Sequence, residues 1–475
     1  MSPAESSGIL GAGAYAPALR IAAAEFEDAW GRFSPPGIEQ KAVPEADEDA
    51  LTMAWEAGRR ALAAADATAD DVTWLGFATT TPPLEESDLT ARLGSFFGVP
   101  EDAGRQEFTG STRAGTRALF AALDADLGDG VGLVIASDAP HGSPEDEREH
   151  AAGAGAAALV VGPDAPGEIV DRAEYATPYP GTRFRRLGSE DVEGLDVTSY
   201  DRQAFSEALG GAVSTLDADV GEVDAAAVQA PNGGLPYRSA GALGVDAETI
   251  GTCATVQDLG DTAAASVLLS LATALADGDE RILAASFGSG AGADALLIEA
   301  GDVPAVADLE GGTDLSYAEY LRRRGEITGD GPDGGAAYVS VPTWRRSLPQ
   351  RHRLEAGRCP DCGAVVFPPE GACTECHSLV EYEPVALPSS GEVAAVTSIS
   401  LGGEPPEFAA QQEKSGEYGV AIVAFDADGD AVDLPMQVVG TDPDPAVGDD
   451  VTTAIRRIYE QEGVIRYGRK AVAEE

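Results

Sequence analysis

Residues 107–123 read Glu107-Phe-Thr-Gly-Ser-Thr-Arg-Ala-Gly-Thr116 and then Arg117-Ala-Leu-Phe-Ala-Ala-Leu123, and this stretch decides the fold. A polar strand end passes through small residues into an apolar run, which predicts a tight turn at the start of a buried helix. Backbone N–H groups and the helix dipole favour negative charge at the tip of such a turn, so the tip suits a nucleophile. The residue predicted there is Thr112, whose hydroxyl is a weak nucleophile without an adjacent base.

The composition is that of a large, strongly acidic globular protein. The chain has 475 residues, 44% of them hydrophobic, which is enough for two or three domains. Its formal net charge is -50, with acidic residues spread along the whole chain, and this argues against a nucleic-acid-binding surface. We expect a halophilic archaeon as the source, because a salt-rich cytoplasm screens the self-repulsion of surface carboxylates. An ordinary acidic protein is the alternative.

The N-terminus and the cysteines indicate in which cellular compartment the protein resides. The first seven residues have no basic region followed by an apolar run, and no window of the chain is as long and apolar as a membrane span. Four of the five Cys lie in one short segment, which is typical of a metal site and not of a secreted disulfide framework. The sequence therefore predicts a cytoplasmic protein with no membrane association.

Strand-like and helix-like runs recur in two halves of the chain. Val131-Gly-Leu-Val-Ile-Ala-Ser137 reads as a strand in the first half, and Arg281-Ile-Leu-Ala-Ala-Ser286 reads as its counterpart in the second. Aligning them places Thr112 opposite Asp261, at the same helix start in each half. Such a repeat of alternating strands and helices predicts a duplicated α/β fold. Asp261 is otherwise explained as a helix N-cap.

Short motifs lie along the first 300 residues: Lys41-Ala-Val-Pro44, Asp47-Glu-Asp49, Thr52-Met-Ala54, Glu107-Phe-Thr109, Ala114-Gly-Thr116, Gly153-Ala-Gly155 and Phe287-Gly-Ser-Gly-Ala-Gly292. Together they resemble the thiolase superfamily, and more narrowly the archaeal type of 3-hydroxy-3-methylglutaryl-CoA synthase. The resemblance implies a duplicated α-β-α-β-α fold, a coenzyme A thioester as ligand and a homodimer formed through this domain.

The catalytic positions of that family carry other residues here. The family attaches its acyl group to a Cys, moves protons with a Glu and holds a carbonyl with a His. Its Ala-Cys-Tyr-Ala-Gly-Thr run matches Ser111-Thr-Arg-Ala-Gly-Thr116, so Thr112 replaces the Cys, and Arg113 puts a charge where an acyl chain is expected. Thr79 falls at the Glu position and Gln229 at the His position. Because a hydroxyl is far less acidic than a thiol, the match implies a degenerate site.

The resemblance also implies contacts to coenzyme A. The family's CoA-binding Lys falls near Gly234, and Arg238 is a candidate to replace its charge. Arg183-Phe-Arg-Arg186 resembles a segment beside the CoA entrance, so Arg186 is a candidate phosphate contact or a member of a surface ion pair. The loop Gly288-Ser289-Gly290 lets backbones approach closely, and its N–H groups are candidate donors to a thioester carbonyl.

Three other residues are candidates for a rescued catalytic role. Cys253 lies in a strand-like run, where a lone Cys is usually a small core residue. His141 and His150 flank an acidic loop and are expected to be solvated.

The last third of the chain carries a metal motif. Tyr317–Arg324 predicts a short helix, and the run Gly325–Gly335 predicts a linker. Cys359-Pro-Asp-Cys362 and Cys373-Thr-Glu-Cys376 form two C-x2-C pairs. Four thiolates at this spacing predict a closed tetrahedral site for structural zinc, with iron as the alternative.

Alternating runs after Gly391 predict a small β-barrel. The runs and further short motifs are Glu392–Ser400, Tyr418–Phe425, Ala431–Val439, Asp450–Ile458, Tyr320-Leu-Arg322, Pro349-Gln-Arg351, Phe367-Pro-Pro369 and Arg466-Tyr-Gly468. A helix, a zinc ribbon and a barrel in this order resemble the zinc-ribbon OB-fold domains found beside archaeal thiolases and synthases. That resemblance implies a thiolase-fold partner enzyme, with the domain bridging two such enzymes and sheltering a CoA-bound intermediate.

A basic island surrounds Trp344. Residues 344–358 carry five Arg on a strongly acidic chain, so Trp344 and Arg345 are candidates to hold the adenine and phosphates of coenzyme A. The alternative is that these Arg pair with surface carboxylates and dock two domains. We expect a thiolase-like domain at 1–302, a helix and linker at 303–338, a rubredoxin-like zinc ribbon at 339–382 and an OB-fold at 383–475.

Together these features predict a scaffold that binds acyl-CoA, assists a separate thiolase and lacks catalysis of its own. The alternative is an active acyltransferase of the synthase or thiolase class with an altered mechanism.

Overall fold

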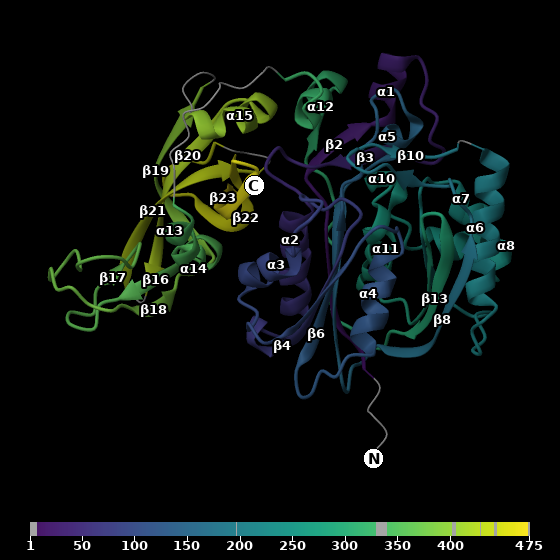
Figure 1. The fold of residues 1–475 in the computed structure, drawn as a ribbon, viewed down its shortest axis with the longest axis horizontal. Coiled ribbons are helices and arrows are strands. Elements are labelled where there is room, and N and C mark those ends of the chain that lie inside the picture. Colours follow the sequence, from purple (N-terminus) through teal and green to yellow (C-terminus); the bar gives the residue numbers. More distant parts are fainter. Residues whose placement is uncertain are drawn as a thin grey trace. The chain divides into compact units, whose positions relative to one another are not determined.

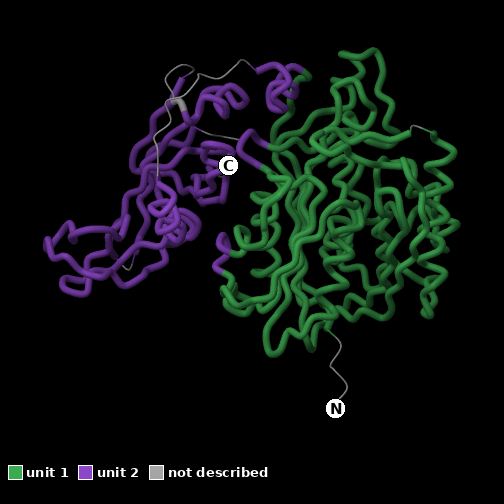
Figure 2. The backbone as a smooth tube through the Cα atoms, viewed as in Figure 1, with its two compact units in different colours: residues 1–44, 49–94, 99–317 green, residues 45–48, 95–98, 318–475 purple. Residues whose placement is uncertain are grey.

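The computed structural model describes residues 7–195, 197–328, 340–400, 405–427, 429–440 and 444–473. The chain forms two compact units, which Figure 2 colours separately. The first contains residues 1–44, 49–94 and 99–317, and the second contains residues 45–48, 95–98 and 318–475. Much of the expected linker Gly325–Gly335 lies outside the described residues.

Two sheets form the frame of the first unit (Figure 1). The larger sheet has the order β14-β1-β7-β6-β4-β5, and the smaller has the order β11-β12-β13-β8. The larger consists of β1 (Gly8–Tyr15), β4 (Val72–Ala78), β5 (Gly104–Phe108), β6 (Val131–Asp138), β7 (Gly155–Gly162) and β14 (Ala305–Val306). The smaller consists of β8 (Glu168–Pro178), β11 (Ala225–Val228), β12 (Arg281–Phe287) and β13 (Ala291–Glu299).

The two sheets repeat one pairing pattern. In the larger sheet β7 pairs antiparallel with β1 and β6, and β6 pairs parallel with β4. In the smaller sheet β13 pairs antiparallel with β8 and β12, and β12 pairs parallel with β11. The predicted internal duplication is therefore confirmed.

Helices cover both sheets. α2 (Ala50–Ala64) packs on β1 and β7, and α6 (Thr198–Val213) packs on β13 and β8. α4 (Ala114–Leu123) packs on β4 and β6, and α11 (Ser266–Asp277) contacts β7 and β11. Figure 1 shows α4 and α11 between β6 and β13. The resulting order of helix, sheet, helices, sheet and helix confirms the predicted α-β-α-β-α fold.

Local sequence explains where these helices begin. Asp49 caps α2, since its carboxylate accepts hydrogen bonds from the Leu51 and Thr52 amides at 2.9 and 3.1 Å. Thr52 Oγ1 accepts the Asp49 amide at 2.8 Å in return, and such a capping box contributes about 1 kcal/mol. α4 follows the turn predicted at residues 109–113.

The remaining elements up to residue 317 are short. They are β2 (Leu19–Ala22), α1 (Ala23–Trp30), β3 (Gln40–Val43), α3 (Leu89–Phe97), α5 (Glu147–Ala151), β9 (Phe184–Arg185), β10 (Val192–Glu193), α7 (Leu235–Arg238), α8 (Ala240–Leu243), α9 (Ala247–Gly251), α10 (Val256–Leu259) and β15 (Thr313–Asp314), with 3-10 turns at Ala69–Asp71 and Ala263–Ala265. Several of them carry the loops that line the cavity described below.

The second unit contains a ribbon and a barrel. α12 (Tyr317–Arg324), α13 (Val341–Arg346) and α14 (Leu348–Arg353) precede the ribbon strands β16 (Glu355–Arg358), β17 (Val365–Val366) and β18 (Glu383–Ala386). The strands β19 (Ser390–Ile399), β20 (Tyr418–Ala427), β21 (Asp430–Val439), β22 (Asp450–Gln461) and β23 (Val464–Ala473) close a barrel in the order β19-β20-β21-β23-β22, with a 3-10 turn at Pro406–Phe408 and α15 (Ala409–Ser415) between β19 and β20. The predicted helix, ribbon and barrel are confirmed.

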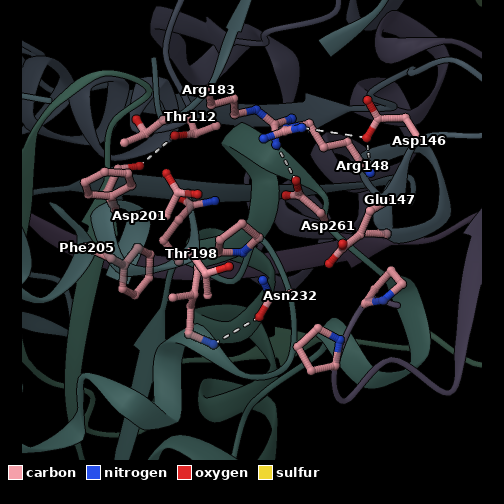
Figure 3. Close-up of a pocket in the computed structure, with 18 of the residues that line it drawn as sticks. Thr112, Asp146, Glu147, Arg148, Arg183, Thr198, Asp201, Phe205, Asn232 and Asp261 are labelled. Carbon is pink, nitrogen blue, oxygen red and sulfur yellow. Dashed lines mark hydrogen bonds and ion pairs between the residues drawn. The ribbon is translucent and has the colours of Figure 1, made fainter. Parts of the chain in front are cut away.

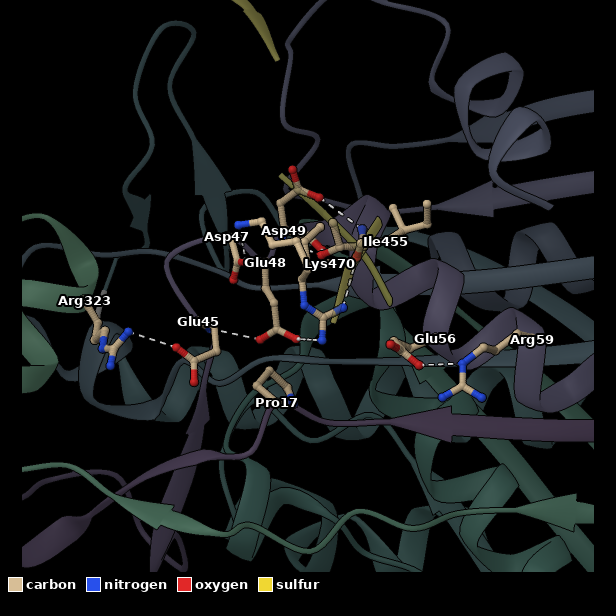
Figure 4. A network of polar contacts seen from close by, with 12 residues as sticks. Pro17, Glu45, Asp47, Glu48, Asp49, Glu56, Arg59, Arg323, Ile455 and Lys470 are labelled. Carbon is tan, nitrogen blue, oxygen red and sulfur yellow. Dashed lines mark hydrogen bonds and ion pairs between the residues drawn. The ribbon is translucent and has the colours of Figure 1, made fainter. Parts of the chain in front are cut away.

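Residues 45–48 belong to the second unit through buried ion pairs (Figure 4). Lys470 on β23 is fully buried, and its ammonium lies 2.7 Å from Asp47 Oδ2. The other pairs are Arg456 with Glu48 at 3.3 Å and Arg323 with Glu45 at 2.9 Å. Burial raises the pKa of the Glu45 carboxyl to about 7 in spite of Arg323. Sequence patterns did not indicate this network.

Within the described ranges, no helix has both the length and the apolar character needed to cross a membrane.

Candidate functional site

A cavity of about 660 Å³ opens in the first unit. Thr112, Gln229, Asp261, Ser289 and Arg238 all line it, although they come from widely separated parts of the chain (Figure 3). The duplicated fold explains this convergence, because Thr112 lies two residues before α4 and Asp261 lies two residues before the 3-10 turn that leads into α11. The cavity therefore lies where the two halves present equivalent helix starts.

The Thr112 hydroxyl forms a hydrogen bond with the main chain. Thr112 is 4% exposed, and its Oγ1 donates to the Phe287 carbonyl at 2.6 Å. Ser289 Oγ donates to Thr112 Oγ1 at 3.3 Å and accepts the Thr112 amide at 3.2 Å. A carbonyl oxygen does not remove a proton from a hydroxyl, so this arrangement does not generate an alkoxide nucleophile.

Gln229 and Asp261 are held by the start of the second central helix. Gln229 Nε2 donates to the Ala263 carbonyl at 2.8 Å, and Ser286 Oγ donates to Gln229 Oε1 at 3.3 Å. Asp261 Oδ1 accepts the Ala263 amide at 2.9 Å, and its Oδ2 accepts from Arg183 Nη1. Asp261 lies one residue before Thr262, the N-cap of the 3-10 turn, so the N-cap expectation was wrong by one residue, although the Asp261 carboxylate accepts an amide of that turn. Its ion pair with Arg183 lies in the cavity wall.

Thr79 does not line the cavity. It is fully buried at the end of β4, where its hydroxyl donates to Asp138 Oδ1 at 2.9 Å. Thr80, Thr81 and the Ala264 amide donate to the same carboxylate. Burial raises the pKa of Asp138, and these donors oppose that rise. Sequence reasoning missed Asp138, although an Asp ending the neighbouring parallel strand, opposite a run of three Thr, could have indicated it.

The glycine loop makes room for the partly buried side chain of Arg113. A Cβ on Gly288 would lie 2.8 Å from Arg113 Cδ and 2.4 Å from the Ala291 carbonyl oxygen, so the loop needs glycine there. Arg113 Nη1 lies 3.2 Å from Asp294 Oδ1 on β13. The expectation that Arg113 enters the acyl site was wrong, because an opposite charge beneath the loop holds its side chain, and Arg113 does not line the cavity.

The remaining candidate side chains do not reach the cavity. Cys253 is buried in the core, where burial raises the pKa of its thiol to about 12. His141 lies 3.3 Å from Asp191. His150 is buried, contrary to the expectation of a solvated side chain, because it packs against Phe26. Burial lowers the pKa of His150.

Exposed arginines line the cavity as well. Arg238 and Arg32 are both exposed, and neither forms an ion pair with any residue that the structure describes. Arg32 was not identified from the sequence, because nothing near it in the chain resembles a ligand-binding motif. Arg186 instead lies outside the cavity, with its side chain 72% exposed and 2.9 Å from Glu193. Its role as a phosphate contact stays a prediction.

The four clustered cysteines fit a tetrahedral metal ion. Their sulfur atoms all lie within 4.8 Å of one another, with Cys359–Cys376 and Cys362–Cys373 both at 3.7 Å. A tetrahedron with zinc–sulfur bonds of about 2.3 Å has edges of about 3.8 Å, so the spacing suits zinc. All four corners are thiolates, which leaves no open position for catalysis.

Trp344 is enclosed by cations. The indole is 8% exposed, and the guanidinium carbons of Arg351 and Arg466 lie 4.2 and 4.7 Å from its ring centroid. Arg345 is exposed. A nucleotide base reaches this ring only if the surrounding groups move, so the proposed contacts of Trp344 and Arg345 with coenzyme A stay a prediction.

The fold and the cavity define a thiolase-like protein. An HMG-CoA synthase complexed with CoA superposes with a TM-score of 0.60 at 19% identity, covering 71% of this chain and 95% of that one. A 3-oxoacyl-[acyl-carrier-protein] synthase III from Aquifex aeolicus superposes with a TM-score of 0.54 at 19% identity, covering 62% and 99%. These similarities confirm the predicted fold.

Sequence comparison identifies the family within the thiolase-like proteins. The hydroxymethylglutaryl-CoA synthase of Archaeoglobus fulgidus is 31% identical over 341 residues, which are 67% of this chain and 99% of that protein. The Methanopyrus kandleri synthase is 32% identical over 312 residues, covering 62% and 88%. The chain therefore belongs to the hydroxymethylglutaryl-CoA synthase family. Residues 346–382 also match the ChsH2 rubredoxin-like zinc ribbon domain, which together with the sulfur geometry confirms the predicted zinc ribbon.

Proposed function

We propose that this protein binds an acyl-CoA thioester in the cavity beside Thr112 without forming an acyl-enzyme, and that it serves as a scaffold for a separate thiolase-fold enzyme. The observation that carries the proposal is the Thr112 hydroxyl, which donates to the Phe287 carbonyl and, among the described residues, has a side-chain hydrogen bond only with the Ser289 hydroxyl. Among the described residues that line the cavity there is neither a Cys nor a His. This composition of the wall supports binding without an acyl-enzyme.

The binding part of the proposal rests on charge and on relatives. Arg32 and Arg238 are exposed cations that form no ion pair with the described residues, on a chain in which Asp and Glu number 81 against 31 Lys and Arg. Such guanidinium groups suit phosphates, which accept paired hydrogen bonds. A structural relative has been solved in complex with CoA, and the sequence relatives are named for a CoA thioester that they synthesise. We therefore assign the ligand as a coenzyme A thioester.

The scaffold part rests on the second unit. It contributes a closed tetrahedral thiolate site and a barrel, and neither offers an open metal position. A ribbon and barrel attached to a degenerate thiolase-like unit support a role in assembly, in which the partner enzyme performs the chemistry and this chain shelters the bound intermediate. We place this assembly in the cytoplasm, with the thiolase-like unit forming a homodimer.

An active acyltransferase is the second candidate. It is favoured by the position of Thr112, which lies in the cavity two residues before α4, where the helix dipole stabilises developing negative charge. That enzyme would form a covalent acyl adduct on Thr112.

Calorimetric titration with CoA and acetyl-CoA tests the binding. The proposal expects saturable binding of both, weakened by Arg238→Glu, together with co-purification of a thiolase at high salt. A heat of injection that does not depend on ligand concentration would mean that the protein does not bind CoA. It would overturn the ligand assignment and indicate a purely structural assembly protein.

A further inference from the structure

The hydroxyl of Ser289 is hydrogen-bonded to both polar groups of Thr112. It accepts the Thr112 amide at 3.2 Å and donates to Thr112 Oγ1 at 3.3 Å. Ser289 is half-buried and lines the cavity, whereas Thr112 is only 4% exposed. The Thr112 amide, which lies two residues before α4, is therefore paired with a side chain of the cavity wall.

The other amides of the glycine loop are mostly used within the protein as well. Gly288 donates its N–H to the Gly292 carbonyl at 3.0 Å, and Gly290 donates its N–H to Thr182 Oγ1 at 3.2 Å. The N–H of Ser289 remains, since none of the described residues accepts it. A ligand carbonyl that approaches this loop thus finds one backbone donor there, and not several.

The number of donors decides how strongly a bound carbonyl is activated. N–H groups aimed at the oxygen stabilise the negative charge that develops when a nucleophile attacks, and removing one such donor lowers the rate by about 10²–10³-fold. The start of α4 would make the Thr112 amide an effective donor, because the helix dipole favours negative charge there. The Ser289 hydroxyl accepts this amide and so withdraws it from the ligand.

We propose that the Ser289 hydroxyl keeps the Thr112 amide from the ligand carbonyl, so that a bound thioester is held without being activated toward any nucleophile. This inference rests on the proposed function, because it concerns the carbonyl of the same thioester. It goes beyond the weak nucleophilicity of Thr112, since a carbonyl that is not activated also resists water and thiols that enter from solvent. Ser289 is a positioning residue in this role, because it acts through the Thr112 amide.

The test compares two ligands that differ only at the carbonyl. Acetyl-CoA and S-ethyl-CoA, in which a CH2 group replaces the carbonyl, are titrated into the full-length protein by calorimetry in one KCl-rich buffer. Ser289→Ala removes the hydroxyl and keeps the backbone amides. The preference for acetyl-CoA over S-ethyl-CoA should rise about fivefold in this variant, because the released Thr112 amide gains a hydrogen bond to the carbonyl.

Ser143→Ala is the matched control. Ser143 also lines the cavity, but its hydroxyl donates to Asp191 at 2.9 Å, so the same change should leave the wild-type preference as it is. An unchanged or reduced preference in Ser289→Ala, or an equal rise in Ser143→Ala, overturns the inference. A loss of S-ethyl-CoA affinity of more than about threefold in Ser289→Ala overturns it too, because Ser289 then holds the ligand as a whole.

A second measurement follows the reactivity of the bound thioester. Hydroxylamine attacks the carbonyl carbon of acetyl-CoA, which gives acetohydroxamate and releases CoA as the thiol, and the hydroxamate is quantified with ferric iron. Acetyl-CoA bound to an excess of wild-type protein should react no faster than free acetyl-CoA. A faster reaction overturns this inference and leaves the proposed binding intact. No binding of acetyl-CoA or S-ethyl-CoA overturns the proposed function and this inference together.

Discussion

Asp294 gives a quantitative prediction about the loop beneath the cavity. Its carboxylate is fully buried on β13, accepts the Thr116 hydroxyl at 2.7 Å and faces Arg113 at 3.2 Å. Burial raises the pKa of this group from 3.8 to about 6, although Arg113 and Thr116 oppose the rise. Arg113 therefore does not fully offset the desolvation of its partner.

The sign of the pH dependence follows from that shift. The folded-state pKa of Asp294 lies above the unfolded-state value, so between about pH 4 and pH 6 the native state binds more protons. The contribution of Asp294 to the free energy of unfolding is thus greatest at low pH and is lost as the pH rises through about 6. Two pKa units correspond to about 3 kcal/mol in total, of which about 1.4 kcal/mol falls between pH 5 and pH 7.5.

Asp294→Asn removes this titration while keeping the shape of the side chain. The free energies of unfolding of wild type and variant are measured by denaturant titration at several pH values in one KCl concentration. In the difference between the two proteins, the contributions of the other titrating groups cancel. Wild type should lose about 1.4 kcal/mol relative to the variant between pH 5 and pH 7.5. Asp129→Asn makes the same change at an exposed position and is the matched control for the substitution itself. A difference that stays constant across this range would refute the raised pKa of Asp294.

Three further changes test other parts of the structure. Cys359→Ser should lower the zinc content per chain, measured by elemental mass spectrometry, because the tetrahedral site loses one of its four thiolate ligands. Full retention of zinc would contradict the four-thiolate site. Lys470→Met should destabilise the second unit by about 3–5 kcal/mol, because it leaves Asp47 buried without its partner. Adding Asp47→Leu should recover much of this loss, as measured by thermal unfolding. An unchanged midpoint of unfolding in the single variant would show that the ion pair does not stabilise the unit. Arg238→Glu should weaken CoA binding by about tenfold in calorimetry. Arg185 is exposed and lies outside the cavity, so Arg185→Glu should leave CoA binding unchanged. Equal effects of the two substitutions would indicate a general effect of charge.

The fold was accessible from the sequence because its signals are local and repeated. The two strands predicted at residues 131–137 and 281–286 carry the same small residues near their ends, and the turn before Ala114 joins a polar run to an apolar one. The cysteine spacing specified the ribbon in the same way, since two C-x2-C pairs have few other uses. Each of these features lies within a short stretch of chain.

The site was accessible only in part, because much of it depends on contacts between distant residues. Matching motifs indicated Thr112 and Gln229, and both line the cavity. Arg113 was misplaced because its partner Asp294 lies on a strand of the other half, and the position of Thr79 beside Asp138 depends on how two strands align. No local pattern shows that Arg183 pairs with Asp261.

We propose that the cavity holds a thioester that Thr112 does not attack. Incubation of the purified protein with acetyl-CoA, followed by intact mass spectrometry, tests this when calorimetry in the same buffer reports binding. The protein mass should stay unchanged under conditions where the ligand is bound. A mass increase of one acetyl group that disappears in Thr112→Ala would contradict it.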